Sequence, residues 1–170
     1  MTRRDFLVKW LVYVLALLPV LVLALYVFPW VPVLGTIPAL LPVAAITVAV
    51  LEGPVGGAGF GLFVGILADA LIPGIPGTMT FALCFLGACS GAAARYGVHQ
   101  NMIGCLICSG ISLFLINIVR VIYLSLRGTA PLGTLLLTAA GEIFWSLVFL
   151  PLVYGIFLWV FRRVPKATVF

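Results

Sequence analysis

Charged side chains inside apolar segments are the residues of this chain best suited to chemistry. Asp69, Arg120 and Glu142 each interrupt a long apolar run, and Asn117 lies one helical turn before Arg120. Charges inside a membrane are costly, and they usually pair with one another or line a polar path. Two carboxylates and a guanidinium could perform acid–base catalysis, hold a ligand, or lock helices together.

The rise of an α-helix gives an estimate of how deep each charged group lies. With about 1.5 Å per residue, Asp69 lies about 22 Å, Arg120 about 28 Å and Glu142 about 30 Å from the inner membrane boundary. All three therefore converge near the outer leaflet. Asn117, Arg120 and Arg127 also share one side of the fifth predicted helix. We expect Arg120 to pair with Asp69 or Glu142, either as a helix-locking ion pair, in simple interfacial solvation, or as part of a ligand site.

A catalytic interpretation has less support from the sequence. No nucleophile, metal triad or phosphate-binding loop accompanies the two carboxylates. The glycines do not form a dinucleotide-binding fingerprint, because no strand–helix–strand unit surrounds them. We therefore expect a protein that is not an enzyme and that uses no metal and no cofactor.

Small residues recur every four positions in two neighbouring segments, which places them on one face of each predicted helix. The first segment carries Gly53, Gly57, Gly61 and Gly65, followed by Asp69, and the second carries Gly87 and Gly91 beside Ala88 and Ala92. Such faces let helix backbones approach closely in a membrane. The stripe predicts either packing of these two helices against each other or a docking groove for a partner's transmembrane helix.

The composition indicates that lipid, rather than water, surrounds the folded chain. Of 170 residues, 65% are hydrophobic and 8% are charged, with a mean hydropathy of +1.35. A soluble domain carries about 25% charged residues. An apolar surface as large as that of this chain therefore requires a lipid bilayer. The net charge of +5 comes from residues at segment ends, which indicates membrane topology rather than nucleic-acid binding.

Segment lengths predict an all-α integral membrane protein with a single domain over residues 1–170. Crossing the hydrocarbon takes about 20 helical residues. Pro42 is expected to kink the second span, Pro54 suits the first turn of the third, and Pro151 lies inside the sixth. The six predicted spans cover residues 6–28, 34–51, 54–72, 78–96, 102–126 and 132–161.

The basic residues predict the orientation. With the N-terminus inside, the cytoplasmic side receives Arg3, Arg4, Lys9, Arg95, Arg162, Arg163 and Lys166, and the outer side receives Arg120 and Arg127. Positively charged residues accumulate on the cytoplasmic side, so this arrangement is favoured. Five spans would place one terminal basic group outside, whereas six place both termini in the cytoplasm.

The glycine-rich segment also resembles a known family. The stretch from Glu52 to Asp69, the following turn that ends at Gly77, and the next helix rich in small residues resemble the rod shape-determining protein MreD family. Gly65 and Asp69 keep the closing spacing of the family pattern. Chain length, hydropathy and the basic C-terminal end are similar across most of the chain.

This resemblance implies a non-catalytic scaffold of the bacterial cell-elongation machinery in the cytoplasmic membrane. Members of the family pair with MreC, a bitopic membrane protein, and work with RodA, a class B penicillin-binding protein and MreB filaments. MreD is also similar in fold to the substrate-binding subunits of energy-coupling-factor transporters. The alternative expectation is therefore a vitamin-binding subunit that uses Asp69, Arg120 and Glu142 near the outer face.

Overall fold

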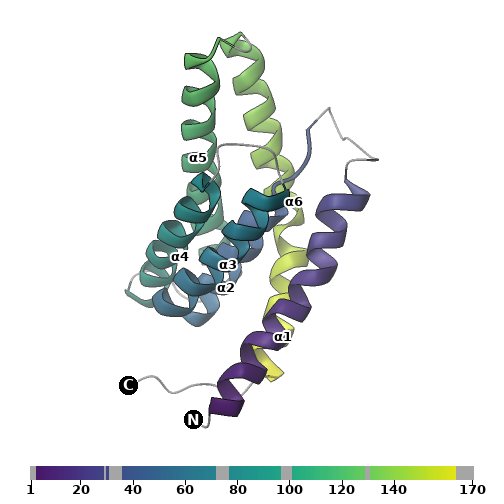
Figure 1. Cartoon of the computed structure of the whole chain (residues 1–170), viewed down its shortest axis with the longest axis vertical. Coiled ribbons are helices and arrows are strands. Elements are labelled where there is room, and N and C mark those ends of the chain that lie inside the picture. Colours follow the sequence, from purple (N-terminus) through teal and green to yellow (C-terminus); the bar gives the residue numbers. More distant parts are fainter. Residues whose placement is uncertain are drawn as a thin grey trace.

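The computed structural model describes residues 3–28, 30, 36–71, 77–96, 101–128 and 131–163, with the side chains of residues 3–7 excepted. The described chain is helical, as predicted, with six α-helices and one π-helical stretch, η1, that continues the first helix (Figure 1). The elements are α1 (Arg3–Val22), η1 (Leu23–Val27), α2 (Leu40–Glu52), α3 (Pro54–Leu71), α4 (Thr78–Tyr96), α5 (Met102–Leu126) and α6 (Leu132–Arg163).

Five of these segments are long and apolar enough to cross a membrane, which makes the chain a multi-pass membrane protein. They are the stretch Val8–Val27 and the helices α3, α4, α5 and α6. Helix α2 is the exception. It has 13 residues and is about 20 Å long, shorter than the hydrocarbon thickness of about 30 Å.

The predicted start of the second span, at residue 34, lies outside the described residues. Thr36–Ala39 is not helical, and α2 begins at Leu40. Proline disfavours the helical conformation in the residue before it, so Pro38 works against an earlier start. Pro42 lies in the first turn of α2, where its missing N–H breaks no hydrogen bond, rather than in the helix interior where it would produce the predicted kink.

Helix α2 is the centre of the bundle. Every residue from Leu40 to Leu51 is buried, and α2 packs against α1, α3, α4, α5 and α6. The N-terminal end of α2 finds a hydrogen-bond partner inside the protein, because the Ala39 N–H donates to Ser146 Oγ at 2.8 Å. The Ser146 hydroxyl in turn donates to the Glu142 carbonyl oxygen at 2.6 Å, so this buried helix end leaves its first donor paired.

A single glycine joins α2 to α3. Gly53 has a φ of 91°, a conformation that other residues adopt at a cost, and its N–H donates to the Ala49 carbonyl at 2.9 Å. Pro54 then begins α3, as predicted. The two helices therefore reverse direction with no intervening loop, which holds α3 against the buried α2.

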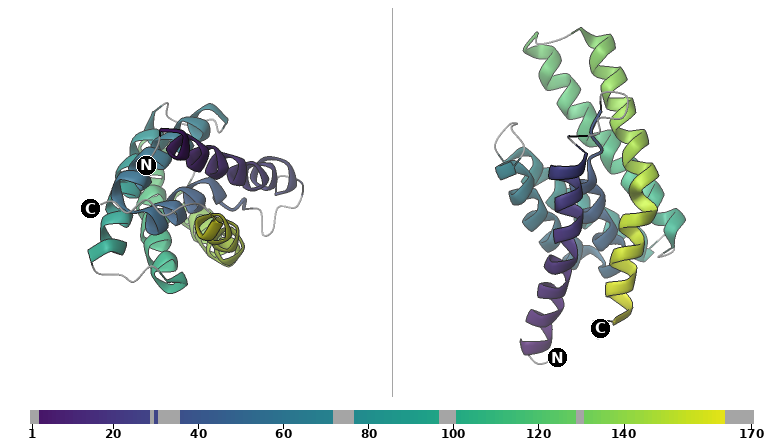
Figure 2. Two further views of the ribbon diagram at one scale, coloured as in Figure 1. Left: turned by 90° about the horizontal axis from the view of Figure 1, so that it is seen from below. Right: turned by 90° about the vertical axis from the view of Figure 1, so that its right-hand side faces the viewer.

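Helices α5 and α6 form a hairpin that extends beyond the other helices at one end of the molecule (Figures 1 and 2). Helix α6 has 32 residues and is about 48 Å long. The start of α1 and the end of α6 lie at the opposite end of the molecule (Figure 1). The first and last helices therefore have their outer ends on the same side of the bundle.

Candidate functional site

Asp69 lies at the end of α3 and binds the beginning of α4. Its carboxylate accepts hydrogen bonds from the Met79 N–H at 3.2 Å, the Thr80 N–H at 2.9 Å and the Thr80 hydroxyl at 2.6 Å. Free N–H groups at a helix start attract a carboxylate, both as donors and through the helix dipole. The structure therefore assigns Asp69 to capping α4 rather than to pairing with Arg120.

Arg120 and Glu142 lie side by side on the protruding hairpin. Arg120 Nη1 is 2.9 Å from Glu142 Oε2, and the two side chains are 53% and 19% exposed. Asn117 does not join them. Its side chain is buried and donates to the Leu113 carbonyl at 3.1 Å, within α5. Of the four residues expected in one polar cluster, the structure brings together only Arg120 and Glu142.

The glycine stripe of α3 packs directly on α4. A Cβ atom built at Gly61 would lie 2.3 Å from the Leu83 carbonyl oxygen, and one at Gly65 would lie 2.4 Å from the Thr80 Cα. Such distances are too short for real Cβ atoms, so only glycine fits at either position. The two backbones touch, which is the close approach that small residues permit in membranes.

The remaining glycines of the two segments belong to the same interface. A Cβ at Gly57 would lie 2.5 Å from the Gly87 carbonyl oxygen, and one at Gly87 would lie 2.4 Å from that of Gly57. A Cβ at Gly91 would lie 2.5 Å from the carbonyl carbon of Gly53. Helix α4 occupies this face of α3, so a partner helix could reach it only if the two helices separated.

A second ion pair, between α1 and α2, was not anticipated from the sequence. Lys9 Nζ pairs with Glu52 Oε2, and the Tyr13 hydroxyl donates to Glu52 Oε1 at 2.6 Å. The Lys9 and Glu52 side chains are only 9% and 10% exposed, and Tyr13 is fully buried. The pair with its tyrosine is called the α1–α2 lock below.

Aromatic rings surround the α1–α2 lock. The Tyr13 ring lies 5.9 Å from Trp10, 6.2 Å from Phe60 and 6.3 Å from Phe157, measured between ring centroids. These rings come from α1, α3 and α6, and they keep water away from the charges. A pair in such surroundings interacts more strongly than one in water, but both partners must be present.

Two features of the sequence could have revealed the lock. Lys9 and Tyr13 are four residues apart and therefore share one face of α1. Glu52 ends the second predicted span, which returns the chain to the membrane boundary where the first span begins. The charge pattern places Lys9 among the cytoplasmic basic residues and indicates no partner for Glu52, so it does not predict this pair.

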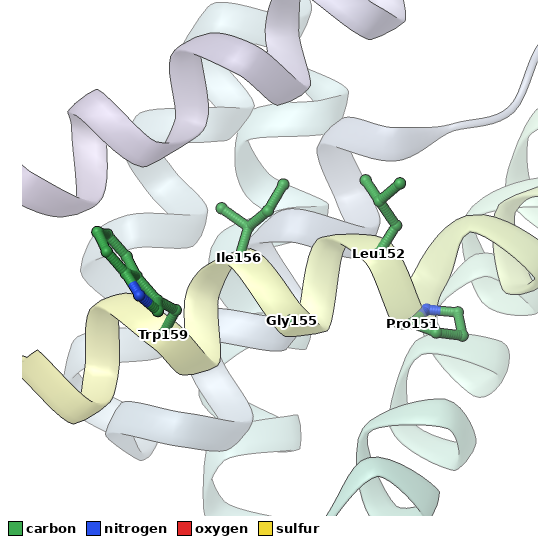
Figure 3. Close-up of a pocket in the computed structure, with 5 residues that line it drawn as sticks. All are labelled: Pro151, Leu152, Gly155, Ile156 and Trp159. Carbon is green, nitrogen blue, oxygen red and sulfur yellow. The ribbon is translucent and has the colours of Figure 1, made fainter.

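A shallow groove runs along the outer face of α6. It has a volume of about 520 Å³ and is lined by Pro151, Leu152, Gly155, Ile156 and Trp159. Figure 3 shows Leu152, Ile156 and Trp159 on the same side of the helix. Among the residues that the structure describes, no three His, Cys, Asp or Glu side chains form a group that could hold a metal ion.

Comparison of the chain with protein-family models, with curated proteins and with solved structures finds no match.

Proposed function

We propose that this protein is a non-catalytic scaffold of the bacterial cell-elongation machinery. In this role it lies in the cytoplasmic membrane with both termini in the cytoplasm. It binds an MreC-like bitopic protein and helps to maintain rod shape by coordinating peptidoglycan synthesis. RodA, a class B penicillin-binding protein and MreB are its further partners. The resemblance of the segment from Glu52 to Asp69 to the MreD family supports this assignment.

The observation that carries the proposal is that the three carboxylates whose side chains the structure describes bind the chain itself. Glu52 pairs with Lys9, Asp69 caps α4, and Glu142 pairs with Arg120. These bonds hold helices together, and they occupy the carboxylates with partners from the chain itself. A structural role for the polar groups fits a scaffold better than it fits an enzyme or a solute receptor.

Recognition by such a scaffold would take place inside the bilayer. The surface of the helices is largely apolar, with exposed side chains such as Val55 on α3, Phe81 on α4 and Ile103 on α5. Helices in lipid associate through close packing and hydrogen bonds rather than through the hydrophobic effect. A single transmembrane helix of a bitopic partner is a suitable ligand for this kind of surface.

The second candidate is a substrate-binding subunit of an energy-coupling-factor vitamin transporter. Its support is the Arg120–Glu142 pair, in which the guanidinium is 53% exposed and could contact a polar solute. Asp69, which this function would also require near the solute, instead bonds to the start of α4. The scaffold is therefore the better supported of the two.

The test is gentle extraction of the full chain from native membranes, followed by mass spectrometry of the material that co-purifies. A bitopic MreC-like protein with elongation enzymes supports the scaffold. A vitamin with paired ATPases and a coupling subunit overturns it in favour of the transporter.

A pair of variants locates the partner on α3. Gly59 is exposed, and no atom lies within 4 Å of a Cβ built there, so Gly59→Leu adds bulk to the outer face without disturbing the α3–α4 interface. Loss of the partner in this variant, with unchanged thermal unfolding, would place the partner on that face. Gly61→Leu is unsuitable for this purpose because it disrupts the fold itself.

A further inference from the structure

The groove on α6 is continuous with a basic helix end. Pro151, Gly155, Trp159 and Arg163 follow one another at four-residue spacing, which places them along one face of the helix. The distance from Pro151 to Arg163 along the axis is about 18 Å. One leaflet of the hydrocarbon core is about 15 Å thick. The groove together with the basic helix end therefore matches the length of one leaflet.

Gly155 creates the floor of the groove. It is exposed, and no atom lies within 4 Å of a Cβ built at this position. Leu152 and Ile156, on the same side of the helix, supply apolar walls (Figure 3). The shape and the apolar lining suit an extended hydrocarbon chain.

Arg163 is held at the end of the groove by Trp159. The guanidinium carbon of Arg163 lies 4.3 Å from the centroid of the Trp159 ring, in a cation–π contact. Arg162 is exposed beside it, and in the part of the chain that the structure describes neither arginine forms a salt bridge with a carboxylate. Their two charges exceed the partial charge of about −0.5 at the helix C-terminus, so this end attracts anions.

We propose that the α6 groove binds an anionic phospholipid. One acyl chain lies along Gly155 beside Leu152 and Ile156, and the phosphate accepts hydrogen bonds from Arg163 and Arg162. Charge complementarity selects this occupant. An apolar partner helix would fill the groove but leave both guanidinium groups without an anion, whereas an anionic lipid satisfies the groove and the charges together.

The proposal goes beyond the scaffold function and is tested without any protein partner. The purified full chain is equilibrated with mixed micelles of phosphatidylglycerol and phosphatidylcholine, and the retained lipid is counted by native mass spectrometry. We expect the wild-type chain to retain phosphatidylglycerol preferentially. Arg163→Gln should weaken that retention about fivefold, and the double change with Arg162→Gln about thirtyfold.

A matched glycine pair on α6 separates the groove from general lipid binding. Gly155→Leu fills the groove and should abolish the retained phosphatidylglycerol. Gly133→Leu adds the same bulk at the other end of the helix, where a Cβ also meets nothing within 4 Å, and should leave retention unchanged. Thermal unfolding of both variants verifies that they are folded.

Three outcomes would overturn the proposal. The first is equal retention of the two lipids by the wild-type chain, and the second is unchanged retention in Gly155→Leu. The third comes from extracting Gly155→Leu from native membranes: loss of a bitopic partner there, with phosphatidylglycerol still retained in the micelles, would assign the groove to a partner helix. Because the micelles contain no partner, failure of the scaffold function does not affect the lipid measurement.

Discussion

The two ion pairs of this protein have similar chemistry and opposite surroundings. In the α1–α2 lock, the Lys9 and Glu52 side chains are almost fully buried, and Tyr13 adds a further hydrogen bond. On the hairpin, the guanidinium of Arg120 is largely exposed and pairs with Glu142. Each pair joins two successive α-helices, and the paired residues are 43 positions apart in the α1–α2 lock and 22 positions apart on the hairpin.

This difference indicates which of the two ion pairs the stability of the fold depends on. A buried charge that loses its partner has no water to replace it, whereas an exposed charge regains solvation. The α1–α2 lock also connects a helix that has few other neighbours, because α1 packs mainly on α2 and α6. Helices α5 and α6, by contrast, are consecutive and also contact each other through packing.

The largest loss of stability is expected when one charge of the α1–α2 lock is removed. Glu52→Gln leaves the Lys9 ammonium buried without a counter-charge and should lower the free energy of unfolding by about 3–5 kcal/mol. Thermal unfolding of the purified chain in detergent measures this loss. The double variant Lys9→Met with Glu52→Gln should regain much of the stability, and failure to regain any would show that the charge pair is not the cause.

The next largest effect is expected at the contact between α3 and α4. Gly61→Leu places a side chain where a Cβ already lies 2.3 Å from the Leu83 carbonyl, so α3 and α4 must separate. We expect a loss of about 1–3 kcal/mol or more in the same unfolding measurement. Gly59→Leu, two residues away on the open face, is the control and should be close to neutral. Equal losses in both variants would contradict the close α3–α4 packing.

A smaller effect is expected at the start of α4. Asp69→Ala removes the acceptor of the Thr80 N–H and hydroxyl and should cost about 1–2 kcal/mol, the range for loss of a helix cap. Hydrogen exchange at Met79 and Thr80 should rise along with the loss of stability. Unchanged protection at these amides would argue against capping by Asp69.

The smallest effect is expected on the hairpin. Arg120→Gln breaks an exposed pair and should cost about 0–1 kcal/mol. The measurement is the same thermal unfolding, with added salt as a second variable, because exposed pairs weaken as ionic strength rises. A loss as large as that of Glu52→Gln would contradict the distinction between the two pairs.

Much of the fold follows from local features of the sequence. The bounds of α4 and α5, and the start of α3 at Pro54, agree with the predicted spans because proline, glycine and loss of apolar character mark them. The close contact of the third and fourth helices also follows, since glycines at four-residue spacing on both helices permit it.

The parts that the sequence did not reveal depend on contacts between distant residues. The N–H of Ala39, just before α2, is bonded by Ser146, which is 107 positions away. Asp69 binds the backbone of α4 rather than Arg120, and no side-chain pattern indicates a backbone partner. The position of Lys9 near Glu52 requires knowing which helices are neighbours, and local spacing does not determine that.

The short central helix has a consequence for how the protein is made. Helix α2 has 13 residues and is surrounded by five other helices, so its apolar surface is covered by protein rather than by lipid. Three of its largest neighbours, α3, α4 and α6, are synthesised after it. A nascent chain that ends shortly after Glu52 therefore lacks the surroundings that stabilise α2 in the finished fold. We expect stable integration of this helix to be a late event in biogenesis, which glycosylation mapping of progressively longer nascent chains would time.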